Sequence, residues 1–152
     1  MTSSSRPLSA ALPGTWELLS RIDVNDAGER RDEPGLGSDP IALLVYDRAG
    51  HFAAQFMKRD RSAAAITDAP VAGSNNTRAQ GGYDAYFGTY TVDDATGRVT
   101  QTLLGALSAE SVGMVITREM QVDGDRLVIA LRTTSMAGEP VTRTLTWKRV
   151  GA

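Results

Sequence analysis

Residues 114–134, MVITREMQVDGDRLVIALRTT, decide the fold class of this protein. Apolar side chains alternate with polar ones over 114–122, and a second, largely apolar run follows at 126–134. A period of two is typical of a half-buried strand, because successive side chains of a strand point to opposite faces. Asp-Gly-Asp at 123–125 lies between the two runs and is a tight-turn signal. The stretch therefore predicts an antiparallel β-hairpin.

The same pattern recurs along the rest of the chain. Further strands are predicted at 16–24, 41–47, 51–58, 86–92, 99–104 and 141–150. Eight antiparallel strands in 152 residues most simply close into an up-and-down barrel, which has no free edge and encloses room for one small ligand. The predicted fold class is all-β, and a two-sheet sandwich is the structural alternative.

The first predicted strand has an apolar face and a charged face. Its apolar side chains are Trp16, Leu18, Ile22 and Val24, and they alternate with Glu17, Arg21 and Asp23. Two of the connections between strands, 25–40 and 59–84, exceed the ~2–5 residues of a simple hairpin loop. Long loops at a barrel mouth can act as lids, and disorder without a function is the competing interpretation.

Composition excludes several classes of function. The chain has 16 basic and 18 acidic residues and no block of like charge, so nucleic acid is not an expected partner. It has no cysteine, which excludes disulfides, thiol nucleophiles and thiolate metal sites and is compatible with a reducing cytoplasm. No apolar run reaches the length of a membrane span. We expect a cytoplasmic protein with a flexible tail at 1–13 and one barrel domain at 14–152.

Several sequence blocks resemble the lipocalin-like domain family. They are GTW at 14–16, LLVYDRAGHFAAQFMKRDR at 43–61, AYFGTYTVD at 85–93, DGDRL at 123–127 and LTWKRV at 145–150. The resemblance implies a calycin-type barrel in which Trp16 plugs the closed end beneath Arg149, with Trp147 as a second structural residue. Related small barrels carry hydrophobic ligands, and others act as cofactor-free cyclases, isomerases or lyases in secondary metabolism.

The sequence departs from that family on the strand at 99–104. The family often has histidine and glutamate where this chain has Gln101, Thr102 and Leu104. If these positions line the interior, the pocket is less polar than usual, and Gln101 is its remaining polar candidate.

Arginines lie on faces that should point into the barrel. Arg118 shares a face with Met114 and Ile116, and Arg143 and Arg149 share a face with Trp147. A buried guanidinium needs a carboxylate, a carbonyl or a ligand oxygen. For Arg149 we favour the cap over Trp16. Arg118 is the best candidate for a catalytic or anchoring group, whereas a structural ion pair is the alternative for Arg118 and Arg143.

Tyrosine and glutamine side chains complete the predicted site. Tyr86 and Tyr90 share a face with Gly88, so their hydroxyls could project into a cavity and donate to a carbonyl oxygen, although simple packing is the alternative. Gln55 would be a polar anchor if it points inward. The predicted pocket lining is Arg143, Gln55, Gln101, Met114, Ile116 and Leu131.

No cofactor or metal is predicted. His51, the sole histidine, follows Gly50 at a hairpin turn, where we expect it to be exposed. A haem ligand or the base of a serine triad would have to be this residue. Both are therefore disfavoured.

Two classes of function remain open from the sequence. We lean narrowly to a cofactor-independent enzyme, because inward polar groups among apolar walls can bind an enolate, ketone or carboxylate. The alternative is a non-catalytic carrier of a similar hydrophobic molecule, and a third class, a structural barrel, would apply if side chains fill the interior. We expect a monomer or homodimer with a small-molecule partner and no membrane partner.

Overall fold

The structure is a computed structural model that describes residues 6–66, 78–135 and 137–151. Nine strands are described: β1 Gly14–Asn25, β2 Arg30–Arg31, β3 Ile41–Tyr46, β4 His51–Met57, β5 Tyr83–Asp93, β6 Arg98–Ala106, β7 Val115–Asp123, β8 Arg126–Thr134 and β9 Pro140–Arg149. The short helix α1 Leu8–Ala11 precedes them, and two 3-10 turns, η1 Ala63–Ala65 and η2 Ala109–Ser111, lie in loops.

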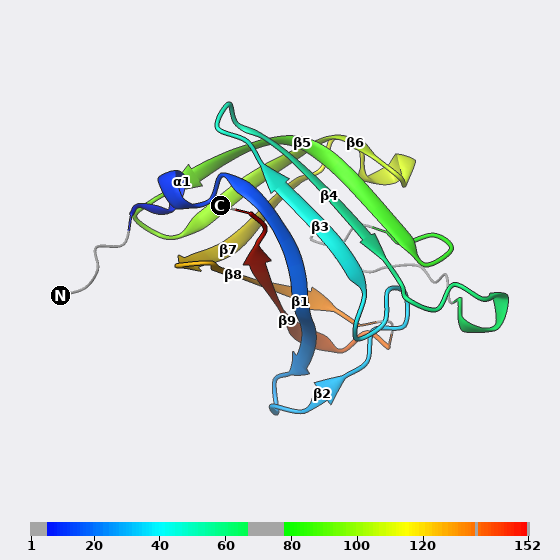
Figure 1. Cartoon of the computed structure of the whole chain (residues 1–152). Coiled ribbons are helices and arrows are strands. Elements are labelled where there is room, and N and C mark those ends of the chain that lie inside the picture. The colour runs from blue at the N-terminus through cyan, green and yellow to red at the C-terminus, as the bar shows by residue number, and fades with distance from the viewer. Residues whose placement is uncertain (1–5, 67–77, 136, 152) are drawn as a thin grey trace.

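The strands form a closed antiparallel barrel (Figure 1). Neighbours in the barrel are neighbours in sequence, and β1 closes the ring because it pairs with both β3 and β9. Trp16, for example, lies opposite Leu44 of β3 and Arg149 of β9. The prediction of an eight-stranded up-and-down barrel is confirmed, with the short β2 added beside the end of β1.

The barrel has two different ends. The closed end is the end that contains Trp16 and the tight turns after β3, β5 and β7. The mouth is the opposite end, where the two long connections lie. The turn at Asp123–Asp125 is tight because Gly124 adopts a φ of 61°, which L side chains rarely adopt. Residues 67–77 of the second long connection lie outside the described part of the chain.

A bulge in β1 changes which side chains face inward. The pairing with β9 shifts register between Leu18 and Ser20. Because one extra residue reverses the alternation, Arg21 and Asp23 lie inside the barrel, 7% and 5% exposed. The prediction that these two residues share the outer face with Glu17 is therefore wrong beyond the bulge.

The segment before β1 is part of the fold from residue 8 onward. Helix α1 lies against β5 and β7, and Leu12 after it is fully buried. The carbonyl of Leu12 accepts a hydrogen bond of 3.0 Å from Trp16 Nε1. Residues 8–12, which belong to the segment expected to be a flexible tail, thus contribute an apolar side chain and a carbonyl to the plug at the closed end.

A second irregularity lies between β5 and β6. Their register shifts between Phe87 and Gly88. A Cβ at Gly88 would lie 1.8 Å from the carbonyl oxygen of Thr102, so only glycine permits this approach of the two strands. Gly88 therefore fixes the position of the inward side chains that flank it on β5.

Candidate functional site

Arg118 lies inside the barrel on β7. It is 8% exposed, and its inward neighbours on the strand are Ile116 and Met120, which are 0% and 6% exposed. Its guanidinium donates to the carbonyl of Thr117 at 3.4 Å. Burial lowers the pKa of Arg118, an effect that the nearby Tyr86 and Tyr46 oppose. The predicted inward position of Arg118 among apolar side chains is confirmed.

Arg143 belongs to a buried ion pair near the mouth. Its Nε and Nη2 donate to the two carboxylate oxygens of Asp23 at 2.8 and 2.9 Å. This two-point contact holds β9 to β1 across the seam of the barrel. The alternative of a structural ion pair thus applies to Arg143, and sequence parity missed its partner because of the bulge.

Arg21 forms a second ion pair, with the first long loop. Its Nη1 lies 3.0 Å from Glu33 Oε1 and 3.3 Å from the carbonyl of Gly37. Burial would raise the pKa of Glu33, but the charge of Arg21 and hydrogen bonds from the N–H groups of Gly35 and Leu36 bring it below its ordinary value. The loop is therefore fastened over the mouth by a charge that lies inside the barrel.

Tyr86 is close enough to Arg118, Arg21 and Arg143 for their charges to act on its pKa. Burial raises the pKa of Tyr86 to about 12, while Arg118, Arg21 and Arg143 each lower it and Asp84 raises it. The hydroxyl is therefore protonated at neutral pH and faces a field set by three guanidinium groups. The structure brings together Arg118, Tyr86 and Arg143 of the predicted site and adds Arg21.

Gln101, Tyr46 and Met120 form a hydrogen-bonded cluster in the interior. Gln101 of β6 is 4% exposed, and its Nε2 donates to the Tyr46 hydroxyl at 2.9 Å. That hydroxyl lies 3.8 Å from the sulfur of Met120. Gln101 points inward as predicted, and its partner Tyr46 was not among the predicted site residues.

Two predicted residues lie elsewhere. Gln55 is on the outer face of β4 and exposed, because Phe52, Ala54 and Phe56 take the inward positions; its prediction as an inward anchor is wrong. Tyr90 is half-buried near the closed end, where its hydroxyl donates to the carbonyl of Asp47 at 2.6 Å. The packing alternative therefore applies to Tyr90.

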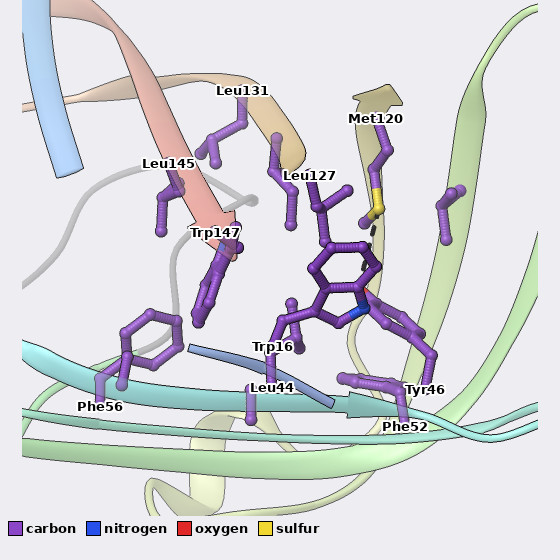
Figure 2. Close-up of a cluster of buried hydrophobic side chains, with 14 of the residues drawn as sticks. Trp16, Leu44, Tyr46, Phe52, Phe56, Met120, Leu127, Leu131, Leu145 and Trp147 are labelled. Carbon is purple, nitrogen blue, oxygen red and sulfur yellow. Dashed lines mark hydrogen bonds between the residues drawn. The ribbon is translucent and has the colours of Figure 1, made fainter. Parts of the chain in front are cut away.

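The remaining predicted lining residues are apolar. Ile116 and Leu131 are buried, and Met114, which precedes β7, packs against the core while partly exposed. Figure 2 shows Trp147 of β9 and Phe56 of β4 pointing towards one another in the interior. The ring of Phe56 lies 5.8 Å from Trp147 and 6.2 Å from Tyr86. The interior of the barrel is thus lined mainly by apolar side chains, with polar groups at a few points.

Trp147 carries an unsatisfied donor in this wall. It is 1% exposed, and its Nε1–H has no hydrogen-bond partner among the described residues. A buried donor without a partner costs about 1–3 kcal/mol. No sequence signal indicates this unsatisfied donor, since the motif at 145–150 marks Trp147 only as structural.

Trp16 and Arg149 form the cap that the family resemblance implies. Trp16 is fully buried, and the Arg149 guanidinium lies 4.3 Å from its ring centroid. Arg149 also donates to the carbonyls of Pro13 at 3.0 Å and Ala11 at 2.6 Å. The cap separates the interior from the outside at the closed end.

The described residues offer no ready site for a metal. No group of three or more histidine, aspartate or glutamate side chains among them is arranged to hold one. His51 is 60% exposed in its side chain, 3.5 Å from Asp47. No helix in the described part of the chain is long and apolar enough to span a membrane.

Comparison with known proteins identifies a family. A family model described as a lipocalin-like domain matches residues 13–150. Among solved structures, the chain is similar to bovine odorant binding protein in complex with a selenium-containing odorant, at 12% identity and a TM-score of 0.47, over 100% of this chain and 78% of that one. The complex of bovine odorant binding protein with undecanal gives 14% identity, a TM-score of 0.47, and 100% and 79% coverage. A comparison with curated proteins gives no match.

Proposed function

The chain belongs to the lipocalin-like domain family. We propose that it binds, inside its barrel, a small and largely apolar molecule that carries a carboxylate or an enolate oxygen. The observation that carries this proposal is the position of Arg118, which is buried between Ile116 and Met120 on the inner face of β7. A guanidinium and a protonated phenol are both donors, so they suit a carboxylate or an enolate.

The aromatic wall suits the rest of such a ligand. The ring of Phe56 lies against those of Tyr86 and Trp147, so these rings would offer apolar surface to the tail of such a ligand, and the Nε1–H of Trp147, which has no partner among the described residues, would offer it a donor. An acceptor on the ligand, or a water that it holds, would satisfy that donor. Binding sites for small molecules are typically of this kind, with apolar linings and few polar anchors.

The test compares two probes that differ only in their head group. We expect octanoate to bind more tightly than 1-octanol by at least ~10-fold in isothermal titration calorimetry, because a hydrogen bond to a charged group contributes about 1.5–3 kcal/mol. In Arg118→Met the ratio of the two affinities should fall towards one. Octanol binding then serves as the internal control for an intact interior.

The matched control variant is Arg126→Met, which removes an exposed arginine from β8. It should leave the affinity ratio as in the parent. Failure of either probe to bind, or an unchanged ratio in Arg118→Met, would contradict the proposal.

A cofactor-independent enzyme is the second candidate, favoured by Asp84. This carboxylate is 3% exposed, lies two residues before Tyr86 on the same face of β5, and acts on the pKa of Tyr86. Asp84 could take a proton from the carbon between the carbonyl and the C=C bond of a β,γ-unsaturated ketone while Tyr86 and Arg118 stabilise the dienolate oxygen, and return the proton to the γ-carbon to give the conjugated isomer.

Proton exchange tests this second candidate apart from the first. With 2-octanone in deuterated water, an enzyme of this kind should speed loss of the α-proton signal in NMR spectra, and Asp84→Asn should abolish the effect. If the protein binds octanoate but the exchange rate of the α-proton equals that in buffer, the enzyme proposal is wrong and only the carrier function remains.

A further inference from the structure

A separate cavity lies outside the barrel at its closed end. It has a volume of about 500 Å³, within the range typical of small-molecule sites. The segment before β1, the turn after β3 and the end of β9 surround it, and Arg6, Tyr46, Asp47, Arg48 and Arg149 contribute to its lining. The Trp16–Arg149 cap lies between this cavity and the interior site, so the two are distinct.

The charges around the cavity are unbalanced. Three arginines line it together with one carboxylate, that of Asp47, which leaves a net charge of two positive. Asp47 is engaged by its own turn, since its Oδ1 accepts hydrogen bonds from the N–H groups of Ala49 at 2.9 Å and His51 at 2.8 Å. The carboxylate therefore offsets one of the three guanidinium charges, while its Oδ1 is held by the turn.

Donors remain available in this cavity. Arg6 and Arg48 have neither a hydrogen bond nor an ion pair with any described residue. Arg149 uses Nη1 and Nη2 for one backbone carbonyl each, which leaves part of its five N–H groups unused. Burial lowers the pKa of Arg149, and the charge of Arg6 lowers it further, as expected where like charges meet.

We propose that this cavity binds a phosphate monoester. Such a group carries about −1.5 to −2 charges at pH 7, which matches the net charge of the lining. Guanidinium groups suit it because their planar N–H pairs fit phosphate oxygens. The volume leaves room for a small organic group beside the phosphate, so a free metabolite and the head group of a lipid are both possible sources of the same chemistry.

The test uses inorganic phosphate and glycerol 3-phosphate in solution, and vesicles of phosphatidylcholine with or without phosphatidic acid. We expect calorimetry to detect binding of glycerol 3-phosphate, or sedimentation to detect binding only to vesicles that contain phosphatidic acid; these two outcomes distinguish the sources. In either assay, Arg6→Gln and Arg48→Gln should each weaken binding about 10-fold, as expected for the loss of a charge-assisted contact.

Arg30→Gln is the matched control. Arg30 is an exposed arginine of β2, at the mouth, and its removal changes the net charge equally. The control should bind within two-fold of the parent (~0.4 kcal/mol). Absence of binding to all of these probes would overturn the proposal. An equal loss of affinity in Arg30→Gln would overturn it too, because that result would show general attraction between opposite charges. Arg149 is left unchanged because it holds the cap.

Discussion

Trp16 and Trp147 allow a comparison between two buried indoles that differ in their hydrogen bonding. Both are almost fully buried, at 0% and 1% exposure. Trp16 donates its N–H to the Leu12 carbonyl at 3.0 Å, whereas the N–H of Trp147 has no partner among the described residues. We predict that Trp16→Phe lowers the free energy of unfolding more than Trp147→Phe does.

The magnitude follows from what each substitution leaves behind. Both replace an indole with a smaller ring, so the loss of packing is similar in the two variants. Trp16→Phe also leaves the buried carbonyl of Leu12 without its donor, which costs about 1–3 kcal/mol. It weakens the contact with the Arg149 guanidinium as well, since tryptophan is the best aromatic partner of a cation. Trp147→Phe removes a donor that was already unsatisfied. We expect the two variants to differ by about 1–3 kcal/mol.

Urea denaturation followed by far-UV circular dichroism measures this difference. Circular dichroism is preferred because the chain has only two tryptophans, so fluorescence would report on a different site in each variant. Equal slopes of the free energy against urea would show that both variants unfold the same structure. A difference below about 0.5 kcal/mol lies within the scatter of surface substitutions and would refute the assigned roles. A greater loss of stability in Trp147→Phe than in Trp16→Phe would refute them as well.

Further predictions concern Gly88, Glu33 and the full plug. Gly88→Ala should destabilise the protein by about 3 kcal/mol or more, since the new Cβ would meet the Thr102 carbonyl at 1.8 Å, whereas Gly124→Ala, with open space around it, should cost only about 1–2 kcal/mol from its positive φ; thermal melts that rank them the other way would refute this. Glu33→Gln should cost about 1–3 kcal/mol at pH 7. Because its folded pKa is lowered, the contribution of Glu33 is present above its ordinary pKa near ~4.3 and is lost as pH falls through the folded value, so the parent and the variant should converge in urea melts at low pH; a constant gap would count against the ion pair with Arg21. Trp16→Ala should cost about 3–5 kcal/mol, and a loss below about 1 kcal/mol in chemical denaturation would show that Trp16 is no plug.

The barrel could be predicted because alternation and turn residues are local signals. The hairpin at 114–134 and the inward face of Arg118 follow from spacing alone, and β7 has no bulge to disturb it. The same reasoning failed at Arg21 and Asp23, since one extra residue between Leu18 and Ser20 reverses every later side chain of β1.

Other parts of the site depend on pairings that sequence spacing does not encode. Gln55 and Phe56 are adjacent in β4, so only one of them can point into the barrel, and the sequence left open which one. In the structure Phe52 and Phe56 pack inward, which places Gln55 on the outer face. The ion pair of Arg143 with Asp23 joins residues 120 positions apart, across a seam that exists only once the barrel has closed. The lack of a partner for the N–H of Trp147 among the described residues likewise depends on what surrounds it in three dimensions.

The central claim is that an acidic ligand lies inside the barrel with its charged group at Arg118. A crystal structure of the protein with octanoate tests it most directly. We predict electron density for the carboxylate within hydrogen-bonding distance of the Arg118 guanidinium or the Tyr86 hydroxyl, with the chain along Phe56 towards Trp147. Octanoate bound outside the barrel, or inside it with the carboxylate pointing out of the mouth and away from Arg118, would contradict the claim.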